Sequence, residues 1–378
     1  MANSREPDER AMLRDAVRSL LKRIDPVAEV RDGSSGAHGY TATSWQAFLT
    51  QLGAGGALVP EQCGGLGLSF GDVCAILEET GRACYNGPFL SSAILSVLVL
   101  LAADEDATPD LRALAAGTRT AAVTGVHYGP DMSRWPAEVT ASAGPDGWTL
   151  TGTASGVIHG LGADVLYVVG HHPDGIGTWA VEADAPGHTR RPLATLDLTR
   201  AQSEHAFTAT PARLVLSPSR DTGRLGAITT LATIALSAEQ VGAASQRLAV
   251  TLDYARTRYQ FGRAIGSFQA IKHRCVDMAI AAEGAQASYE SARDLVDASG
   301  GISECLAKAP PALRRAAAIA GAWCSQAYLS VAVASLQIHG GIGMAWEHDC
   351  HIYLRRAKAS EQLFGDPVQQ RAMLLMTL

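Results

Sequence analysis

Apolar residues recur at intervals of three and four along the beginning of this chain and again along its end. In the first part, between residues 7 and 115, one such face is formed by Met12, Leu13, Val17, Leu20, Leu21 and Ile24. In the last part, from about Gly223, a second face is formed by Leu225, Ile228, Ala232 and Ala235, and then by Val241, Ala244, Leu248 and Leu252. These intervals place side chains on one face of an α-helix, so both parts are predicted to be helical.

Between about residues 119 and 218 the pattern changes to short β-rich runs. Examples begin at Trp148, Val165 and Thr178. Turn-forming sequences separate them, such as Gly-Pro-Asp-Gly from Gly144 and His-Pro-Asp-Gly from His172. The middle of the chain is therefore predicted to be a small antiparallel β domain.

Together these patterns predict an α+β protein with several domains. We expect an N-terminal helical domain at residues 1–116, a middle β domain at 117–220 and a C-terminal helical bundle at 221–378. A four-helix bundle accommodates the last segment. Neither an internal repeat nor a low-complexity tract competes with this organisation.

Composition narrows the classes of function. The chain is 47% hydrophobic and 18% charged, which is ordinary for a globular protein. Its net charge of −6 and its lack of a basic cluster argue against nucleic acid as a partner. The seven cysteines are scattered singly, so we expect neither a disulfide framework nor a metal site.

The location of the protein is predicted from its apolar segments. The N-terminus has no apolar core of a signal peptide, and the most apolar run, from Ile94 to Ala103, is too short to span a bilayer. We therefore expect a cytoplasmic protein without a membrane partner.

The segment from Tyr254 to Gln269 carries the strongest chemical pattern. A helix there ends with Arg258, Phe261 and Gly262 before Gln269 opens the next helix. A helix C-terminus favours cations, the arginine fork suits phosphate, and glycine permits a sharp turn. The pattern predicts a clamp for a diphosphate. The alternative is that Arg258 is a helix-end cation paired with water or Asp253.

This segment resembles the Arg-x-x-Phe-Gly motif of the acyl-CoA dehydrogenase family, flavoproteins that desaturate acyl thioesters. Two other parts of the chain resemble the same family, and the resemblance covers nearly the whole length. They are Trp45 to Gly87, with Leu-Val-Pro-Glu-Gln-Cys-Gly-Gly-Leu-Gly at 58–67, and Gln-Ile-His-Gly-Gly-Ile-Gly at 337–343 followed by Arg-Arg-Ala-Lys at 355–358. The resemblance implies the family's fold, FAD as the cofactor and an acyl-CoA thioester as the substrate.

In this family two subunits share each FAD, and the resemblance divides the site into two halves. The half that binds the ADP end of a neighbour's flavin, here called the trans half, maps onto Arg258, Phe261, Gln269, Gln337, Gly340 and Gly341. All of these positions hold the expected kinds of residue. Arginine supplies a charged donor for the pyrophosphate, and glycine permits close approach of the backbone.

The other half, here called the cis half, departs from the family pattern. Gly156, Val157 and Ile158 stand where the family has an aromatic and a hydroxyl residue that contact the flavin ring. The family's Thr-Glu-Pro loop is replaced by the run from Thr124 to Gly129, in which His127 is expected to be a plain surface residue. We predict that the cis half lacks its flavin-ring contacts.

The family's catalytic base is also missing. Desaturation needs a carboxylate within reach of the α-proton, but Phe364 stands at that position. A second family location, near Ala232, is empty as well. Glu239 and Asp366 are the remaining candidates. The alternatives are a structural carboxylate for Glu239 and a turn residue before Pro367 for Asp366.

These departures predict the partner subunit of a heterotetrameric acyl-CoA dehydrogenase, in which a homologous chain holds the flavin ring. Such complexes in the family act on steroid side-chain thioesters in actinobacteria. One alternative is a self-sufficient homotetramer that uses Glu239 or Asp366 as an unusual base. The other is a non-redox protein that binds an acyl thioester on the same fold.

Overall fold

The chain begins and ends with helices and has one sheet between them. A computed structural model describes residues 7–125, 127, 129, 135 and 138–376. The N-terminal helices are α1 (Pro7–Ile24), α2 (Pro26–Arg31), α3 (Ala42–Leu52), α4 (Phe70–Arg82), α5 (Ser96–Leu101) and α6 (Thr108–Ala115), with short turns at η1 (Ala54–Gly56) and η2 (Glu61–Cys63) and a π-helical segment η3 (Phe89–Leu95). Local sequence sets their ends. Thr41 caps α3 by accepting the Ser44 N–H at 3.1 Å, and Gly53 ends that helix with φ +63°.

The middle of the chain forms a seven-stranded sheet. Its strands are β1 (Ala121–Val123), β2 (Val139–Gly144), β3 (Gly147–Ile158), β4 (Val165–His172), β5 (Gly175–Glu182), β6 (His188–Leu193) and β7 (Gln202–Ser219), with a short turn η5 (Gly160–Gly162). The pairings β4–β5–β7–β3–β2–β4 run in a closed circuit, to which β1 and β6 are added. The predicted purely antiparallel domain is wrong in one respect. β1 and β2 both pair parallel to β4. β3 lies between β2 and β4 in sequence and runs antiparallel to β2, so the chain has returned to the direction of β2 when it enters β4.

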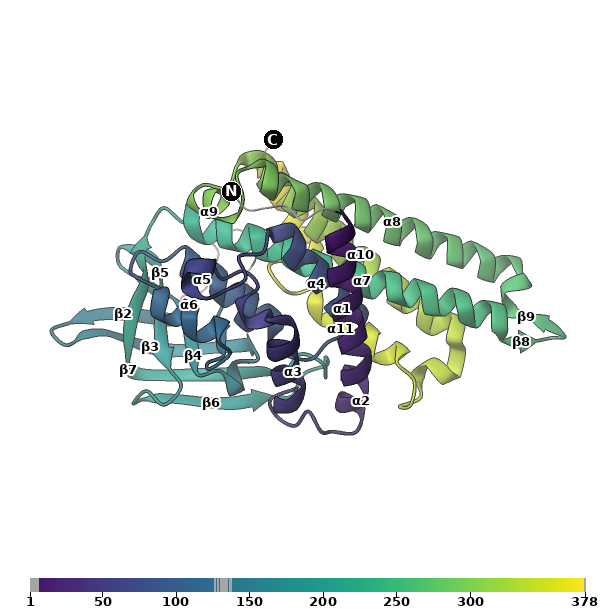
Figure 1. Cartoon of the computed structure of the whole chain (residues 1–378), viewed down its shortest axis with the longest axis horizontal. Coiled ribbons are helices and arrows are strands. Elements are labelled where there is room, and N and C mark those ends of the chain that lie inside the picture. The colour runs from purple at the N-terminus through teal and green to yellow at the C-terminus, as the bar shows by residue number, and fades with distance from the viewer. Residues whose placement is uncertain (1–6, 126, 128, 130–134, 136–137, 377–378) are drawn as a thin grey trace.

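Helices return after the sheet and form the long axis of the molecule. They are α7 (Gly223–Thr257), α8 (Gln269–Ala298), α9 (Ile302–Ala307), α10 (Pro311–His339), α11 (Cys350–Ser360) and α12 (Pro367–Met376), with short turns η6 (Ile265–Ser267) and η7 (Gly340–Met344). The hairpin of β8 (Tyr259–Gln260) and β9 (Arg263–Ala264) joins α7 to α8, at the end of the molecule opposite the large sheet (Figure 1). The order of helices, sheet and helices confirms the predicted fold class, while the residue ranges of the three domains stay a prediction.

Two glycines bring the N-terminal helices against the C-terminal bundle. A Cβ atom on Gly81 of α4 would lie 1.8 Å from the Glu239 carbonyl oxygen of α7, and one on Gly242 would lie 1.8 Å from the Glu78 carbonyl oxygen. Only glycine permits such close backbone contact. A hydrophobic core therefore runs from the N-terminal helices into α7 without interruption.

One helical stretch, Pro311–Met344, is long and apolar enough to cross a membrane by length and composition. It comprises α10 and the following turn η7, and 61% of its most apolar window is buried inside the fold. α10 packs against α7, α8 and α12, so its apolar side chains are accounted for by the core of the bundle.

Candidate functional site

The residues of the predicted trans half lie at the far end of the helical bundle. Arg258 caps the C-terminus of α7, where its N–H donates to the Tyr254 carbonyl at 2.8 Å. Phe261 follows in the tight turn between β8 and β9 with φ +53° and is 92% exposed. Gln269 is the first residue of α8 and is also exposed. The alternative pairing of Arg258 with Asp253 is absent from the ion pairs of the described residues, and both side chains are exposed.

The other trans residues, Gln337, Gly340 and Gly341, lie at or just after the C-terminal end of α10, at the same end of the bundle. Arg274 near the start of α8 donates to the Gln337 side-chain oxygen, and Tyr254 of α7 stacks on His339 of α10 with ring centroids 4.2 Å apart. The structure therefore brings the end of α10 to the junction of α7 and α8, from which it is distant in sequence.

Gly340 and Gly341 form an open turn at this end. Gly340 has φ +65°, and a Cβ atom on either residue would have nothing within 4 Å. This bare backbone is a surface that a diphosphate can approach closely. With the exposed Arg258 guanidinium, the trans half fits the ADP end of FAD, and it faces outward from its own chain.

The cis half, unlike the trans half, does not present an open backbone to a ligand. Gly156 lies in β3, and the His127 imidazole lies against it with Nε2 2.7 Å from the Gly156 carbonyl oxygen. A Cβ atom on Gly156 would lie 2.2 Å from His127 Nε2. The prediction that His127 is a plain surface residue is wrong, because it is half-buried and burial lowers the pKa of its imidazole.

Phe364, which the resemblance places at the position of the family's base, lies in an apolar environment. It is only 5% exposed and has φ +56°, and its carbonyl accepts the Gln370 amide at 2.7 Å. The cavity beside it has a volume of about 40 Å³ and is lined mainly by apolar residues, among them Leu95, Val99, Val123, Ile228 and Ala232. Sites for drug-sized ligands occupy about 300–1,000 Å³. The space next to Phe364 is therefore too small for a bulky acyl group.

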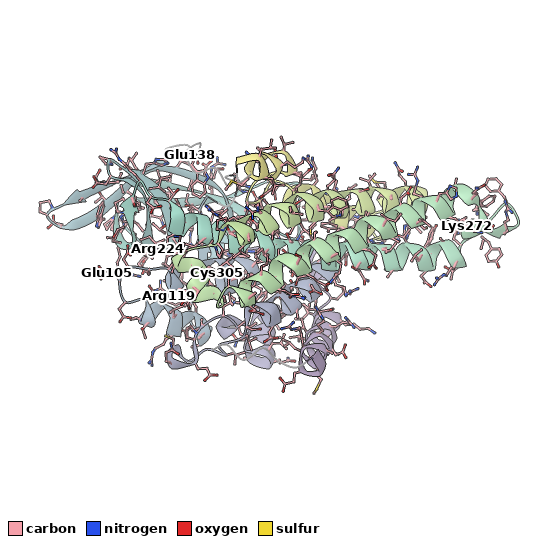
Figure 2. All side chains as sticks on the ribbon, turned by 90° about the horizontal axis from the view of Figure 1, so that it is seen from above. Glu105, Arg119, Glu138, Arg224, Lys272 and Cys305 are labelled. Atoms are coloured by element: carbon pink, nitrogen blue, oxygen red, sulfur yellow. The ribbon has the colours of Figure 1, made fainter. Side chains whose placement is uncertain are left out.

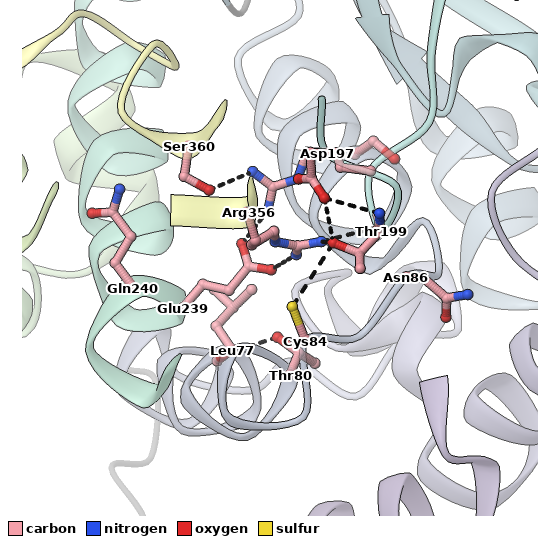
Figure 3. A network of polar contacts seen from close by, with 12 residues as sticks. Leu77, Thr80, Cys84, Asn86, Asp197, Thr199, Glu239, Gln240, Arg356 and Ser360 are labelled. Atoms are coloured by element: carbon pink, nitrogen blue, oxygen red, sulfur yellow. Dashed lines mark hydrogen bonds and ion pairs between the residues drawn. The ribbon is translucent and has the colours of Figure 1, made fainter. Parts of the chain in front are cut away.

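Glu239 is buried and bound through both carboxylate oxygens. Arg200 Nη2 donates to Glu239 Oε2 at 2.5 Å, and Arg356 Nη2 donates to Oε1. Figure 3 shows Glu239 facing Arg356, which also donates to Thr199 Oγ1 at 2.7 Å. Burial would raise the pKa of Glu239, but the Arg200 and Arg356 charges outweigh it and lower that pKa. A carboxylate held in this way has no free oxygen and little tendency to accept a proton.

Asp366 serves the start of a helix. Its Oδ1 accepts the N–H groups of Val368 and Gln369, each at 2.8 Å, at the beginning of α12. This is the arrangement of an N-terminal capping residue. Asp366 does not line the cavity beside Phe364.

A large groove lies where the sheet meets the bundle, and sequence patterns did not indicate it. It has a volume of about 810 Å³ and is lined by the start of α7, the junction of α9 with α10, α12, and the ends of β5 and β7. Arg224, Lys308 and Arg314 bring positive charge to it. Arg224 is paired with Asp104, whereas Lys308 and Arg314 are exposed and have no ion pair within the described part of the chain. Figure 2 shows Arg224 in the half of the molecule that holds the sheet and Lys272 at the opposite end.

Family models match both helical parts of the chain. Residues 7–117 match the acyl-CoA dehydrogenase N-terminal domain, and residues 227–378 match the acyl-CoA dehydrogenase C-terminal domain. The chain is 33% identical over 365 residues to acyl-CoA dehydrogenase IpdE2 of Mycobacterium tuberculosis, covering 96% of this chain and 94% of that protein.

Solved structures of heteromeric complexes have the same fold. A variant of the Tcur3481-Tcur3483 steroid ACAD has a TM-score of 0.85 and 27% identity, over 98% of this chain and 97% of that chain. The ChsE4-ChsE5 complex from Mycobacterium tuberculosis has a TM-score of 0.79 and 26% identity, over 96% of each chain. The two domain matches, the full-length relative and the shared fold together show that this chain belongs to the acyl-CoA dehydrogenase family of FAD-dependent oxidoreductases.

Proposed function

We propose that this chain is the partner subunit of a heterotetrameric acyl-CoA dehydrogenase. In this arrangement it binds the ADP end of a FAD whose ring is held by a homologous catalytic chain. The observation that carries the proposal is the contrast between its two half-sites. The trans half is open and outward-facing, whereas the cis half is closed by His127 at Gly156 and has Phe364 in place of a base.

The chemistry of the family assigns clear roles to the trans residues. Bound FAD would supply the acceptor for a hydride from the β-carbon of the thioester, and a carboxylate of the catalytic chain would remove the α-proton. Arg258 supplies a charged donor for the pyrophosphate, and the backbone at Gly340 and Gly341 lets it approach. Gln269 and Gln337 offer side-chain amides at the same end, and Phe261 offers an exposed ring.

The sizes of the two cavities also argue that this chain does not itself catalyse the desaturation. The groove of about 810 Å³ is large enough for the CoA part of a thioester, and Lys308 and Arg314 would attract its phosphates. The adjacent space of about 40 Å³ beside Phe364 leaves no room for an acyl group of steroid size. The named complexes with the same fold include a steroid ACAD, so we propose that the catalytic partner desaturates an acyl-CoA of this bulky kind.

The geometry gives less support to the self-sufficient homotetramer. Glu239 has both oxygens bound to arginines, and Asp366 caps α12. Neither carboxylate lines the cavity next to Phe364. A non-redox thioester-binding protein is consistent with the large groove, but it gives no account of the open trans half.

Flavin stoichiometry tests the proposal. A homotetramer of the family has four equivalent flavin sites, each with one cis and one trans half. A chain with only trans halves completes none alone, and it completes two when mixed with a partner that has intact cis halves. We expect the isolated chain to be soluble and nearly flavin-free, and the native complex to carry about two FAD per four chains.

Native mass measurement combined with flavin absorbance decides the question. The complex is obtained by co-expressing this chain with the product of the neighbouring gene. Four flavins per tetramer, or full occupancy in a homotetramer of this chain alone, would contradict the heteromer. A colourless homo-oligomer that binds acyl-CoA without flavin, and that takes up no flavin when the homologous chain is added, would favour the non-redox alternative.

A further inference from the structure

Three side chains that can bind a metal ion meet where α10 ends and α11 begins. His339 is the last residue of α10, Cys350 is the first residue of α11, and His348 lies two residues before Cys350. One donor atom from each lies within 4.8 Å of the other two. The sequence pattern does not predict this site, because the η7 turn separates His339 from the other two residues and the spacing matches no common zinc motif.

The imidazole of His339 is held in the orientation that a metal ligand needs. Its Nδ1 lies 2.8 Å from the Ser335 carbonyl oxygen, to which it donates a hydrogen, and its ring stacks on Tyr254. Nε2 therefore keeps a free lone pair. A carbonyl that fixes the second nitrogen of a histidine is the usual support of a metal-binding imidazole.

A buried cation, Arg247, lies in contact with Cys350. Its side chain is 2% exposed, its Nη2 donates to Cys350 Sγ at 3.4 Å, and its guanidinium lies 4.8 Å from the centre of the Tyr353 ring. Its Nε has no hydrogen-bond partner, and no carboxylate pairs with it within the part of the chain that the structure describes. Burial raises the pKa of the Cys350 thiol, and the Arg247 guanidinium opposes that rise by favouring the negatively charged sulfur.

We propose that His339, His348 and Cys350 form a binding site for one borderline d-block cation of the Zn²⁺ class, with water as the fourth ligand. Binding would exchange the thiol proton of Cys350 for the ion and release that proton to solvent. Zinc bonds of roughly 2.0–2.3 Å require the three donors to approach one another by about 1 Å. His348 is half-exposed and provides both the entry path and the freedom to close.

The site would tie the η7 turn to the start of α11. His348 Nδ1 now accepts the Cys350 N–H at 3.2 Å, a long contact that coordination would replace. Because Arg247 adds a positive charge nearby, we expect weaker binding than in a structural zinc finger. The inference uses only these contacts and does not depend on the proposed partner role.

Cobalt binding tests the site with an optical readout. The full chain, without a polyhistidine tag and freed of metal by a chelator, is titrated with Co²⁺. We expect one equivalent to produce a thiolate-to-cobalt charge-transfer band that Zn²⁺ removes. Cys350→Ser should abolish the band, and His348→Ala should weaken Zn²⁺ binding at least tenfold, as loss of a ligand does. Cys275→Ser and His273→Ala are the matched controls and should change neither.

Three outcomes would overturn the site. They are no charge-transfer band in the folded chain, the same band in Cys350→Ser, and unchanged Zn²⁺ affinity in His348→Ala, which would indicate adventitious binding elsewhere. If circular dichroism shows that Cys350→Ser does not fold, His348→Ala decides alone, because removing a half-exposed side chain leaves the core intact.

Discussion

The imidazole of His127 occupies the space beside Gly156, with Nε2 2.7 Å from the Gly156 carbonyl oxygen. The two residues are 29 positions apart and belong to the two segments that depart from the family pattern in the cis half. The unusual residue in one segment therefore contacts the unusual residue in the other. The glycine leaves room that the histidine takes, and the space is closed by the chain itself.

This contact predicts the cost of a side chain at position 156. Gly156→Ala should destabilise the chain by about 1–3 kcal/mol, because the new Cβ meets the His127 ring and because φ is +71°. Adding His127→Ala should restore part of the loss. Gly33→Ala is the control, since Gly33 has φ +79° and nothing within 4 Å of a new Cβ. Equal losses for Gly33→Ala and Gly156→Ala in chemical denaturation would show that the histidine contact contributes nothing.

A second prediction concerns Phe364, which occupies the position of the missing base. Phe364→Glu in the isolated chain should produce no dehydrogenation, because Gly156 and Ile158 still offer no support for a flavin ring. It should also destabilise the fold by more than about 2 kcal/mol, since the new carboxyl enters an apolar cavity. Phe364→Leu keeps the site apolar and should cost less than Phe364→Glu. Acceptor-dye reduction and urea unfolding measure the two effects, and turnover by Phe364→Glu alone would refute our account of the cis half.

A third prediction follows from the buried pair of arginines around Glu239. Glu239→Gln should destabilise the chain by about 3–5 kcal/mol at neutral pH, because it leaves two buried guanidinium groups without their carboxylate. Glu182→Gln, which breaks the exposed pair with Arg119, should cost less than about 1 kcal/mol. Denaturant unfolding of both variants makes the comparison.

The same pair sets a pH dependence. The folded-state pKa of Glu239 is lowered, so its stabilising contribution is fully present above the ordinary glutamate pKa and is lost as pH falls through the lower folded value. Acid unfolding of the parent should therefore show a loss of stability in this range that Glu239→Gln lacks. Parallel acid profiles for the two proteins would mean that the Glu239 charge contributes nothing.

The fourth prediction concerns the trans half in the assembled complex. Arg258→Ala should weaken FAD binding by about 1.5–3 kcal/mol, the value of a hydrogen bond to a charged group. Arg256→Ala removes a neighbouring exposed cation from the last turn of α7 and should have a smaller effect. Flavin fluorescence during dilution of the complex measures both. An unchanged flavin affinity in Arg258→Ala would exclude this residue from the pyrophosphate site.

The sequence by itself determined the helical and β-rich segments, their order and the family; the trans-half motif and Phe364 at the position of the base stay predictions. These are local properties: helical periodicity, turn composition and short motifs depend on residues that lie close together along the chain. They were sufficient for the fold class and the family.

Only the tertiary structure decided what these residues contact. It placed Arg200 and Arg356 on opposite oxygens of Glu239, and it brought His127 to Gly156. It also paired β1 and β2 parallel to β4, and it opened the groove beside Lys308 and Arg314. It brought the end of α10 to the junction of α7 and α8. Each of these features joins segments that are distant in sequence, and their meeting depends on how whole helices and strands pack rather than on any local pattern.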